Sequence, residues 1–140
     1  MCPDPILPGA PLPEEEVRAM NGVTLAYIGD AVYELLVRRY VLSLADSRIR
    51  DLHTRSIAFA NATEQAEAAG RLQPLLSETE RGYYLRGRNA HVGHTPKNKT
   101  EAQYHLATGL EALFGYLYLT GQTGRAQELF SYIVQTASES

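Results

Sequence analysis

The chain is 140 residues long, with 13 basic against 16 acidic side chains and a formal net charge of −3. A chain of this size buries roughly 70% of the surface that it exposes when unfolded, so we expect one domain with its own core. With 44% apolar and 21% charged residues, the composition is that of a globular protein. No apolar run approaches the ~20 residues of a membrane span. A largely disordered chain and a membrane-spanning chain are therefore excluded.

The N-terminal segment is rich in proline. Five prolines lie within residues 1–13, which predicts an extended arm, and residues 14–140 then form the single domain. The first 16 residues carry acidic but no basic side chains, unlike a secretory signal peptide, so we expect a cytoplasmic protein. Cys2 is the only cysteine, which excludes an internal disulfide and a cysteine-based zinc site.

The first half of the domain shows helical patterns and few strand signals. Pro13 before three glutamates suits a first helical turn, with acids at the positive end of the helix dipole. Asn21 predicts the N-cap of a helix that runs to about residue 42. Apolar residues surround most of this helix, so it should be central and largely buried. A second long helical segment is expected over residues 48–72.

Capping signals mark the helices of the second half. Ser77 opens a capping box before a short helix, and Thr100 opens another before a longer helix that carries a leucine stripe and stops at Gly121. Glycine and proline within residues 87–98 predict a loop between these two helices. A last amphipathic helix is expected over residues 124–136. Together these patterns predict an all-α fold without internal repeats.

Positive charge is concentrated in one segment. Residues 81–100 contain five Lys or Arg, two His and no acid, a net charge of +5, so the other 120 residues sum to −8. Such a cluster suggests that the segment binds a polyanion. The alternative is a solvated loop whose arginines pair with acids elsewhere. Tyr83 and Tyr84 beside it could stack on bases, although tyrosines of a helix core are the commoner case.

Two predicted apolar helices each carry an acid in an unfavourable place. Asp30 and Glu34 share one face of the first long helix, and Glu111 is surrounded by leucines in the later one. An unpaired carboxylate in a core costs roughly several kcal/mol. If the helices pack together, Asp30 and Glu111 could converge and hold Mg²⁺ through oxygen ligands. The alternative is a structural ion pair, for example Glu34 with Arg38.

Three blocks of sequence carry a family resemblance. They are LAYIGDAVYELLVR at residues 25–38, RGRNAHVGHTPKN at residues 86–98 and ATGLEALFGYLYL at residues 107–119. In order and spacing they resemble the catalytic domain of the ribonuclease III family, in the reduced branch known as Mini-ribonuclease III. The resemblance implies an all-α, ribonuclease III-type endonuclease that works as a homodimer on double-stranded RNA with Mg²⁺. In this branch it also implies maturation of the 23S ribosomal RNA precursor.

The resemblance also implies roles for single residues. Asp30 and Glu111 match catalytic acids of the family that hold the metal. Two further acids of full-length ribonuclease III correspond to Ala26 and Thr108, a departure that the reduced branch shares, so water or another acid must complete the coordination. The double-stranded-RNA-binding domain that follows the nuclease domain in full-length ribonuclease III is also expected to be absent.

Without that domain, the basic segment is expected to bind the RNA. The candidate RNA contacts are Arg86, Arg88, Asn89, Lys97, Asn98 and Lys99. The apolar helix around Tyr27 and Ile28 is the candidate dimer interface, since such a surface needs covering. Two other hypotheses remain open: a catalytically silent RNA-binding dimer, and a helical adaptor in which Asp30 and Glu111 form ordinary salt bridges.

Overall fold

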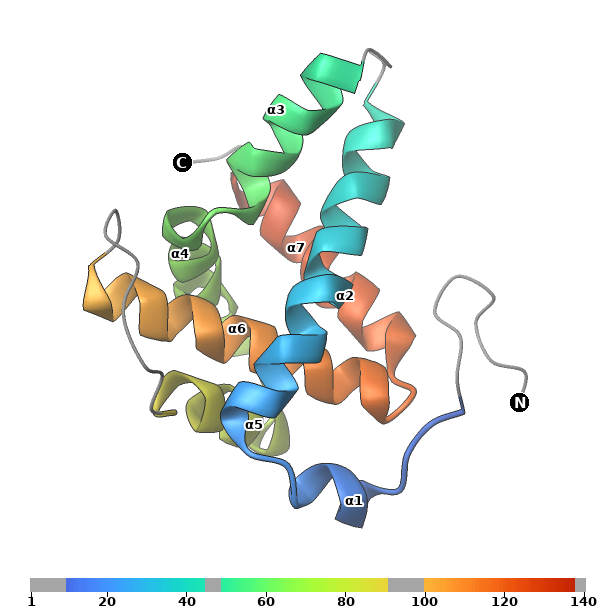
Figure 1. The fold of residues 1–140 in the computed structure, drawn as a ribbon, viewed down its shortest axis with the longest axis vertical. Helices are drawn as coiled ribbons and strands as arrows, with labels where there is room; N and C mark the ends of the chain where they lie inside the picture. Colours follow the sequence, from blue (N-terminus) through green and yellow to red (C-terminus); the bar gives the residue numbers. More distant parts are fainter. Residues whose placement is uncertain (1–9, 45–48, 91–99, 138–140) are drawn as a thin grey trace.

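The computed structural model describes residues 10–44, 49–90 and 100–137, and these residues form helices joined by short connections (Figure 1). No strand occurs in the described ranges, and the predicted all-α fold is confirmed. None of the described helices is long and apolar enough to cross a membrane. The helices are α1 (Glu14–Arg18), α2 (Gly22–Ser43), α3 (Ile49–Ala60), α4 (Ala62–Leu72), the 3-10 helix η1 (Gln73–Leu75), α5 (Glu78–Arg88), α6 (Glu101–Leu119) and α7 (Thr123–Ala137).

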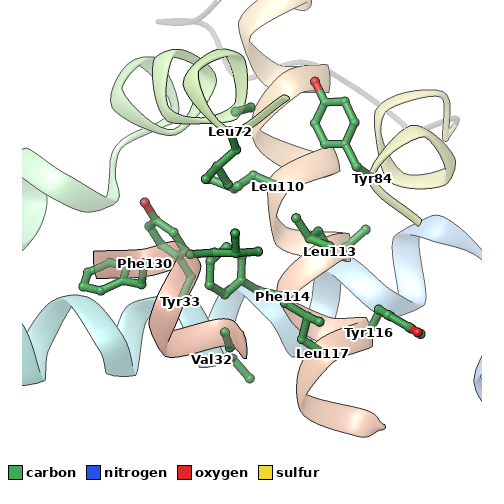
Figure 2. Close-up of a cluster of buried hydrophobic side chains, with 14 of the residues drawn as sticks. Val32, Tyr33, Leu72, Tyr84, Leu110, Leu113, Phe114, Tyr116, Leu117 and Phe130 are labelled. Atoms are coloured by element: carbon green, nitrogen blue, oxygen red, sulfur yellow. The ribbon is translucent and has the colours of Figure 1, made fainter. Parts of the chain in front are cut away.

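The core lies around the crossing of α2 and α6, the two longest helices (Figure 1). Helices α4 and α5 pack against α6, and α7 packs against both α4 and α6. Tyr33 of α2 is fully enclosed and meets Phe114 and Phe130 edge-on, with ring centroids 5.2 and 5.6 Å apart (Figure 2). Helix α6 is covered by other helices on most sides. Helix α2 was expected to be largely buried, but it is buried on one face only and leaves a second face exposed, which includes Val23, Tyr27 and Asp30.

Glycines allow α2 and α6 to touch through their backbones. A Cβ atom on Gly29 would lie 1.6 Å from the backbone oxygen of Glu111, and one on Gly115 would lie 2.1 Å from the backbone oxygen of Leu25. No side chain fits at either point, because real Cβ contacts are never that short. The close approach therefore depends on these two glycines, and one of them directly precedes Asp30.

Most of the predicted helix ends agree with the structure. Asn21 accepts a hydrogen bond from the Thr24 amide at 2.8 Å, and Ser77 forms the full capping box with Glu80. Thr100 accepts from the Gln103 amide at 3.1 Å. Helix α5 continues to Arg88, past the glycine where the loop was expected to begin.

The single long segment predicted over residues 48–72 was wrong. The structure has two helices there, α3 and α4, separated at Asn61. The Asn61 side chain accepts from the Glu64 amide at 2.9 Å and donates to the Ile57 carbonyl at 2.9 Å. One side chain thus caps the end of α3 and the start of α4, and the chain changes direction between them (Figure 1).

The described residues before α1 pack against the end of α6. The Leu12 amide donates to the Leu119 carbonyl at 2.8 Å, and Pro11 lies over Gly121, whose φ is 78°. The predicted N-terminal arm therefore contacts the domain at least from Pro11 onward. Residues 1–9 of that arm lie outside the described residues.

Candidate active site

The helix crossing brings together the two acids that the sequence had suggested. Asp30 follows Gly29 on α2 and is exposed, whereas Glu111 on α6 is partly buried. The Asp30 carboxyl lies close enough to Glu111 to raise its pKa. Because Gly29 packs on the Glu111 backbone, the two carboxyls meet where the helices are closest.

The surroundings of Glu111 oppose its ionisation. Burial and the neighbouring Asp30 carboxyl raise the pKa of Glu111 to about 9, and a hydrogen bond from Gln65 acts in the opposite direction. None of the ion pairs among the described residues includes Asp30 or Glu111. Glu111 therefore keeps its proton at neutral pH, and no basic side chain of the described part forms an ion pair with either acid.

The ion pair between Glu34 and Arg38, which the sequence offered as the alternative to a metal site, is present but does not include Asp30 or Glu111. Glu34 pairs with Arg38 at 3.0 Å, one turn further along α2, and both side chains are substantially exposed. This pair is the one that helical spacing predicts. It leaves Asp30 and Glu111 unpaired, so it does not account for the two acids at the crossing.

Further polar groups around Glu111 were not predicted from the sequence. Gln65 of α4 is only 4% exposed and reaches Glu111. Burial raises the pKa of the Tyr33 hydroxyl, and the charges of Glu64 and Glu111 add to this effect, while Arg71 opposes it. Nothing in the spacing along the chain points to these residues, because Gln65 is brought to the site by the packing of α4 against α6 and Tyr33 by the packing of α2 against α6.

The donor set suits a hard divalent cation. Two carboxyl groups and one side-chain amide offer oxygen atoms, which Mg²⁺ prefers, and a cation between the acids would relieve their repulsion. The described residues contain no group of three or more His, Cys, Asp and Glu side chains that could hold a metal ion. Asp30 and Glu111 would therefore hold a cation that keeps several of its waters, which is usual for Mg²⁺.

The candidate RNA contacts fall into three groups. Arg86 donates from Nη1 to the Arg18 and Met20 carbonyls at 2.7 and 2.9 Å and lies over the Tyr83 ring at 4.7 Å, so it anchors the link between α1 and α2. Arg88 and Asn89 at the end of α5 are exposed, and the Arg88 Nε donates to the Asn89 Oδ1 at 3.2 Å. The other three candidates, Lys97, Asn98 and Lys99, lie outside the described residues.

The two tyrosines beside the basic segment belong to the core. Tyr83 stacks on Tyr116 with ring centroids 3.9 Å apart, and Tyr84 packs against Gly109. Both side chains are buried. They are core residues of the α5–α6 packing, and their rings are not available to stack on bases.

The candidate dimer residues point in different directions. Tyr27 is 81% exposed, and Val23, one turn earlier on the same face of α2, is 42% exposed. Ile28 is partly buried and lies toward Gly115 of α6. The free apolar surface is thus formed by Tyr27 and Val23, and it adjoins Asp30 one turn further along the helix.

Comparison with known proteins identifies the family. The family model of the ribonuclease III domain matches residues 23–122. The chain belongs to the ribonuclease III family. It is 45% identical over 107 residues to Mini-ribonuclease 3 of Symbiobacterium thermophilum, covering 76% of this chain and 82% of the relative. It is 38% identical over 128 residues to Mini-ribonuclease 3 of Thermoanaerobacter sp., covering 91% and 90%.

A solved structure agrees with this assignment. The fold matches the crystal structure of a protein from Fusobacterium nucleatum with a TM-score of 0.77 and 27% identity, over 87% of this chain and 98% of the other. The chain is therefore an endoribonuclease of a family that acts on double-stranded RNA and generally uses a divalent metal. This decides against the adaptor and against the catalytically silent dimer.

Proposed function

We propose that this ribonuclease III-family enzyme cleaves double-stranded RNA with Mg²⁺ held by Asp30 and Glu111, and that it matures the 23S ribosomal RNA precursor in the cytoplasm. The observation that carries the proposal is the contact between these two carboxyls at the crossing of α2 and α6. The choice of substrate rests on the resemblance to the Mini-ribonuclease III branch, which the relatives named Mini-ribonuclease 3 support.

The two acids have different surroundings, which suits different tasks. Asp30 is exposed and can meet RNA and water, whereas Glu111 is held deeper against α2 and α4. Phosphodiester hydrolysis needs an activated water and relief of charge on the leaving oxygen, which bound Mg²⁺ supplies. The contribution of the chain is to fix both carboxylates on two rigid helices, where Gly29 and Gly115 keep the backbones in contact.

The RNA contacts are proposed for the end of α5 and the segment that follows it. Arg88 and Asn89 are exposed there, and Lys97, Asn98 and Lys99 add charge and hydrogen-bonding groups in the same stretch of sequence. Duplex RNA exposes phosphates and 2′-hydroxyls, so such groups can recognise its shape with little sequence readout. We assign Arg86 mainly an anchoring role, because its guanidinium is used by the α1–α2 link.

The enzyme is proposed to act as a homodimer through the exposed face of α2. Tyr27 and Val23 leave an apolar surface there, with Ile28 supporting it from the side of α6. A dimer across this face would place two Asp30 side chains near one interface, which suits the cutting of both strands of a duplex. Sedimentation velocity should report twice the mass of one chain, and a monomer that still makes double-strand cuts would refute the dimer.

Cleavage of defined RNA tests the activity. The protein is incubated with a duplex made from the paired ends of a 23S precursor and with an unrelated duplex of equal length, with Mg²⁺ or with EDTA. We expect cutting with Mg²⁺ only, and faster cutting of the precursor duplex. Asp30→Asn keeps the shape of the side chain but removes its charge, so it should fold and bind RNA but not cut. Unchanged single-turnover cutting by this variant would contradict the assignment.

A further inference from the structure

A groove of about 320 Å³ lies between α2 and α7, which passes behind α2 in Figure 1. Neither the proposed metal site nor the proposed RNA contacts use it. Its floor is apolar and consists of Leu36 and Tyr40 of α2 with Phe130 and Val134 of α7. Its rim is polar, and Arg39 is the charged residue among those that line the groove. The groove therefore suits a ligand that is mainly apolar and carries one negative charge.

The core supports the rings in the floor of the groove. Phe130 meets Tyr33 and Tyr40 edge-on, with ring centroids 5.6 and 6.2 Å apart. Tyr40 also packs edge-on against Phe59 of α3, at 5.4 Å. The floor is thus held in place from below, and a preformed apolar surface gains stability when a ligand covers it.

The groove lies away from the proposed active site. Arg39 follows Asp30 by nine residues, about 2.5 turns of an α-helix, so the two residues lie on opposite sides of α2. None of the ion pairs among the described residues includes Arg39. Duplex RNA is held by several cations along its phosphates, so one arginine above an apolar floor does not suit it.

The chain itself contains a segment of the required chemistry at its N-terminus. Residues 1–9 read MCPDPILPG, in which Asp4 is the only charged side chain and Ile6 and Leu7 are adjacent apolar residues. Three prolines restrict the backbone of this segment, so less conformational entropy is lost when it binds. Its acid complements Arg39, and its two large apolar side chains complement the floor of the groove.

The described part of the arm begins within reach of the groove. The Leu12 amide donates to the Leu119 carbonyl, and Pro11 lies over Gly121, at the link between α6 and α7. With a rise of ~1.5 Å per residue, residues 127–134 lie ~6–17 Å beyond the start of α7. Nine extended residues span up to ~30 Å. The segment can therefore reach the groove of its own chain, and its attachment raises its local concentration there.

We propose that residues 1–9 dock into the groove between α2 and α7 of the same chain, with Ile6 and Leu7 on the apolar floor and Asp4 beside Arg39. The docked segment holds α7 against α2. The proposal does not depend on the nuclease function, since no residue of the proposed metal site takes part in it.

The test uses the only cysteine of the full-length chain, Cys2. A nitroxide attached to Cys2 broadens the amide NMR signals of nearby residues, and the same protein with the nitroxide reduced serves as reference. The Ser43 amide, one turn beyond Arg39, should lose most of its intensity. It should be affected more than Gly124, which lies closer to the attachment point of the segment, and Gly82 on α5 should keep its intensity.

Substitutions in the N-terminal segment test the apolar contacts. Ile6→Ser combined with Leu7→Ser removes both large apolar side chains and should abolish the excess broadening of Ser43 over Gly124. Pro3→Ser is the matched control, because it changes the same segment outside the proposed contacts. It should keep the wild-type pattern.

Substitutions on α2 test the charge pair. Arg39→Gln should weaken docking ~2–5-fold, the range for an exposed ion pair, at a temperature where the segment is partly undocked. Arg38→Gln is the matched control, because Arg38 pairs with Glu34 on another side of the helix. It should leave docking unchanged, and Asp4→Asn should have no further effect in the Arg39→Gln background.

The results decide between three arrangements. If Ser43 is broadened less than Gly124, or if the Ile6 and Leu7 double variant behaves as the wild type does, docking in the groove is overturned. Isotope-labelled chains that carry the nitroxide are then diluted with an excess of chains that carry neither label. Broadening of Ser43 that persists supports docking within one chain, whereas broadening that is lost means that a second copy supplies the segment, which overturns the proposal.

Discussion

Two glutamates that are shielded from solvent, Glu80 on α5 and Glu111 on α6, have opposite electrostatic surroundings. Glu80 is 6% exposed and receives hydrogen bonds from Arg125 and from the Ser77 amide, which hold its pKa below the usual range. Glu111 is partly buried and faces Asp30, and its pKa is raised to about 9. Glu80 forms an ion pair with a basic side chain, and Glu111 forms none with the described residues.

The difference fits a structural role for Glu80 and the proposed metal-binding role for Glu111. Arg125 joins Glu80 to the Leu75 carbonyl and to Glu128, so this cluster ties the start of α5 to the start of α7. The Asp30–Glu111 pair contributes no such link, and burial beside Asp30 makes it costly for Glu111 to ionise. Such a pair suits the proposed metal site, because a cation from outside would complete it.

The largest effect is expected from adding a methyl group where α2 and α6 touch. Gly29→Ala would place a methyl group 1.6 Å from the Glu111 carbonyl oxygen, a backbone atom that cannot move aside. We expect a loss of more than ~3 kcal/mol in the free energy of unfolding, together with loss of cleavage. Urea unfolding followed by circular dichroism measures the first and duplex cutting the second.

Gly82→Ala is the matched control for that change. Gly82 is an exposed helical glycine of α5, and no other atom lies within 4 Å of the place that an alanine methyl group would take. Alanine should therefore stabilise the protein by ~0.5–1 kcal/mol. Equal stability of the two variants would mean that the helices do not need to touch at Gly29.

The next largest effect concerns Glu111 itself. Glu111→Gln should lower cleavage at least ~10³-fold, because several kcal/mol of transition-state stabilisation are lost with the metal. In EDTA the same variant should be more stable than the wild type by ~1–2 kcal/mol at pH 8. Thermal unfolding with and without Mg²⁺ measures both the gain and the loss of metal stabilisation.

The pH dependence of that gain follows from the raised pKa of Glu111. The stability that the protonated group contributes is full below its ordinary pKa of 4.5 and is lost as the pH rises toward about 9. The stability difference between Glu111→Gln and the wild type should therefore grow from pH 5 to pH 9 in EDTA. A constant difference over this range would contradict the raised pKa.

A smaller loss is expected from breaking the structural acid cluster. Arg125→Met leaves the buried Glu80 without its cation. We expect a loss of ~2–3 kcal/mol in the free energy of unfolding at pH 7, which is less than for a fully buried pair because Arg125 is partly exposed. Because the Glu80 pKa is lowered, this stabilisation is present above the ordinary carboxyl pKa and is lost as the pH falls. Glu128→Ala removes only an exposed partner of the same arginine and should cost less than ~0.5 kcal/mol. Mg²⁺-dependent cleavage should survive in both, measured at a temperature where both are folded.

The sequence was most informative where one residue decides a local structure. Asn21 and Ser77 cap their helices as their positions along the chain predict, and an acid among leucines singled out Glu111. The sequence was least informative where the decisive contacts cross between helices. The break at Asn61 depends on one side chain that caps two helices, and the position of Gln65 depends on the packing of α4 against α6.

The smallest effect concerns Arg86 and Arg88, which the sequence analysis predicts to have the same role as RNA contacts. Arg86 and Arg88 lie two residues apart in the basic segment, but only Arg86 is tied to the carbonyls of the α1–α2 link. Arg86→Ala should therefore destabilise the protein by ~1–2 kcal/mol through the lost hydrogen bonds. Arg88→Ala should change stability by less than ~0.5 kcal/mol, because its side chain is exposed.

Binding of duplex RNA should distinguish the two arginines in the opposite order. If Arg88 contacts a phosphate, Arg88→Ala releases about one counterion fewer, and the slope of log affinity against log salt concentration falls by ~1. Arg86→Ala should keep the wild-type slope at a temperature where it is folded. A filter-binding titration at several salt concentrations in EDTA measures both slopes without cleavage. If both variants kept the full slope while Arg88→Ala also melted early, the end of α5 would pair with internal acids, and the RNA would have to be held elsewhere.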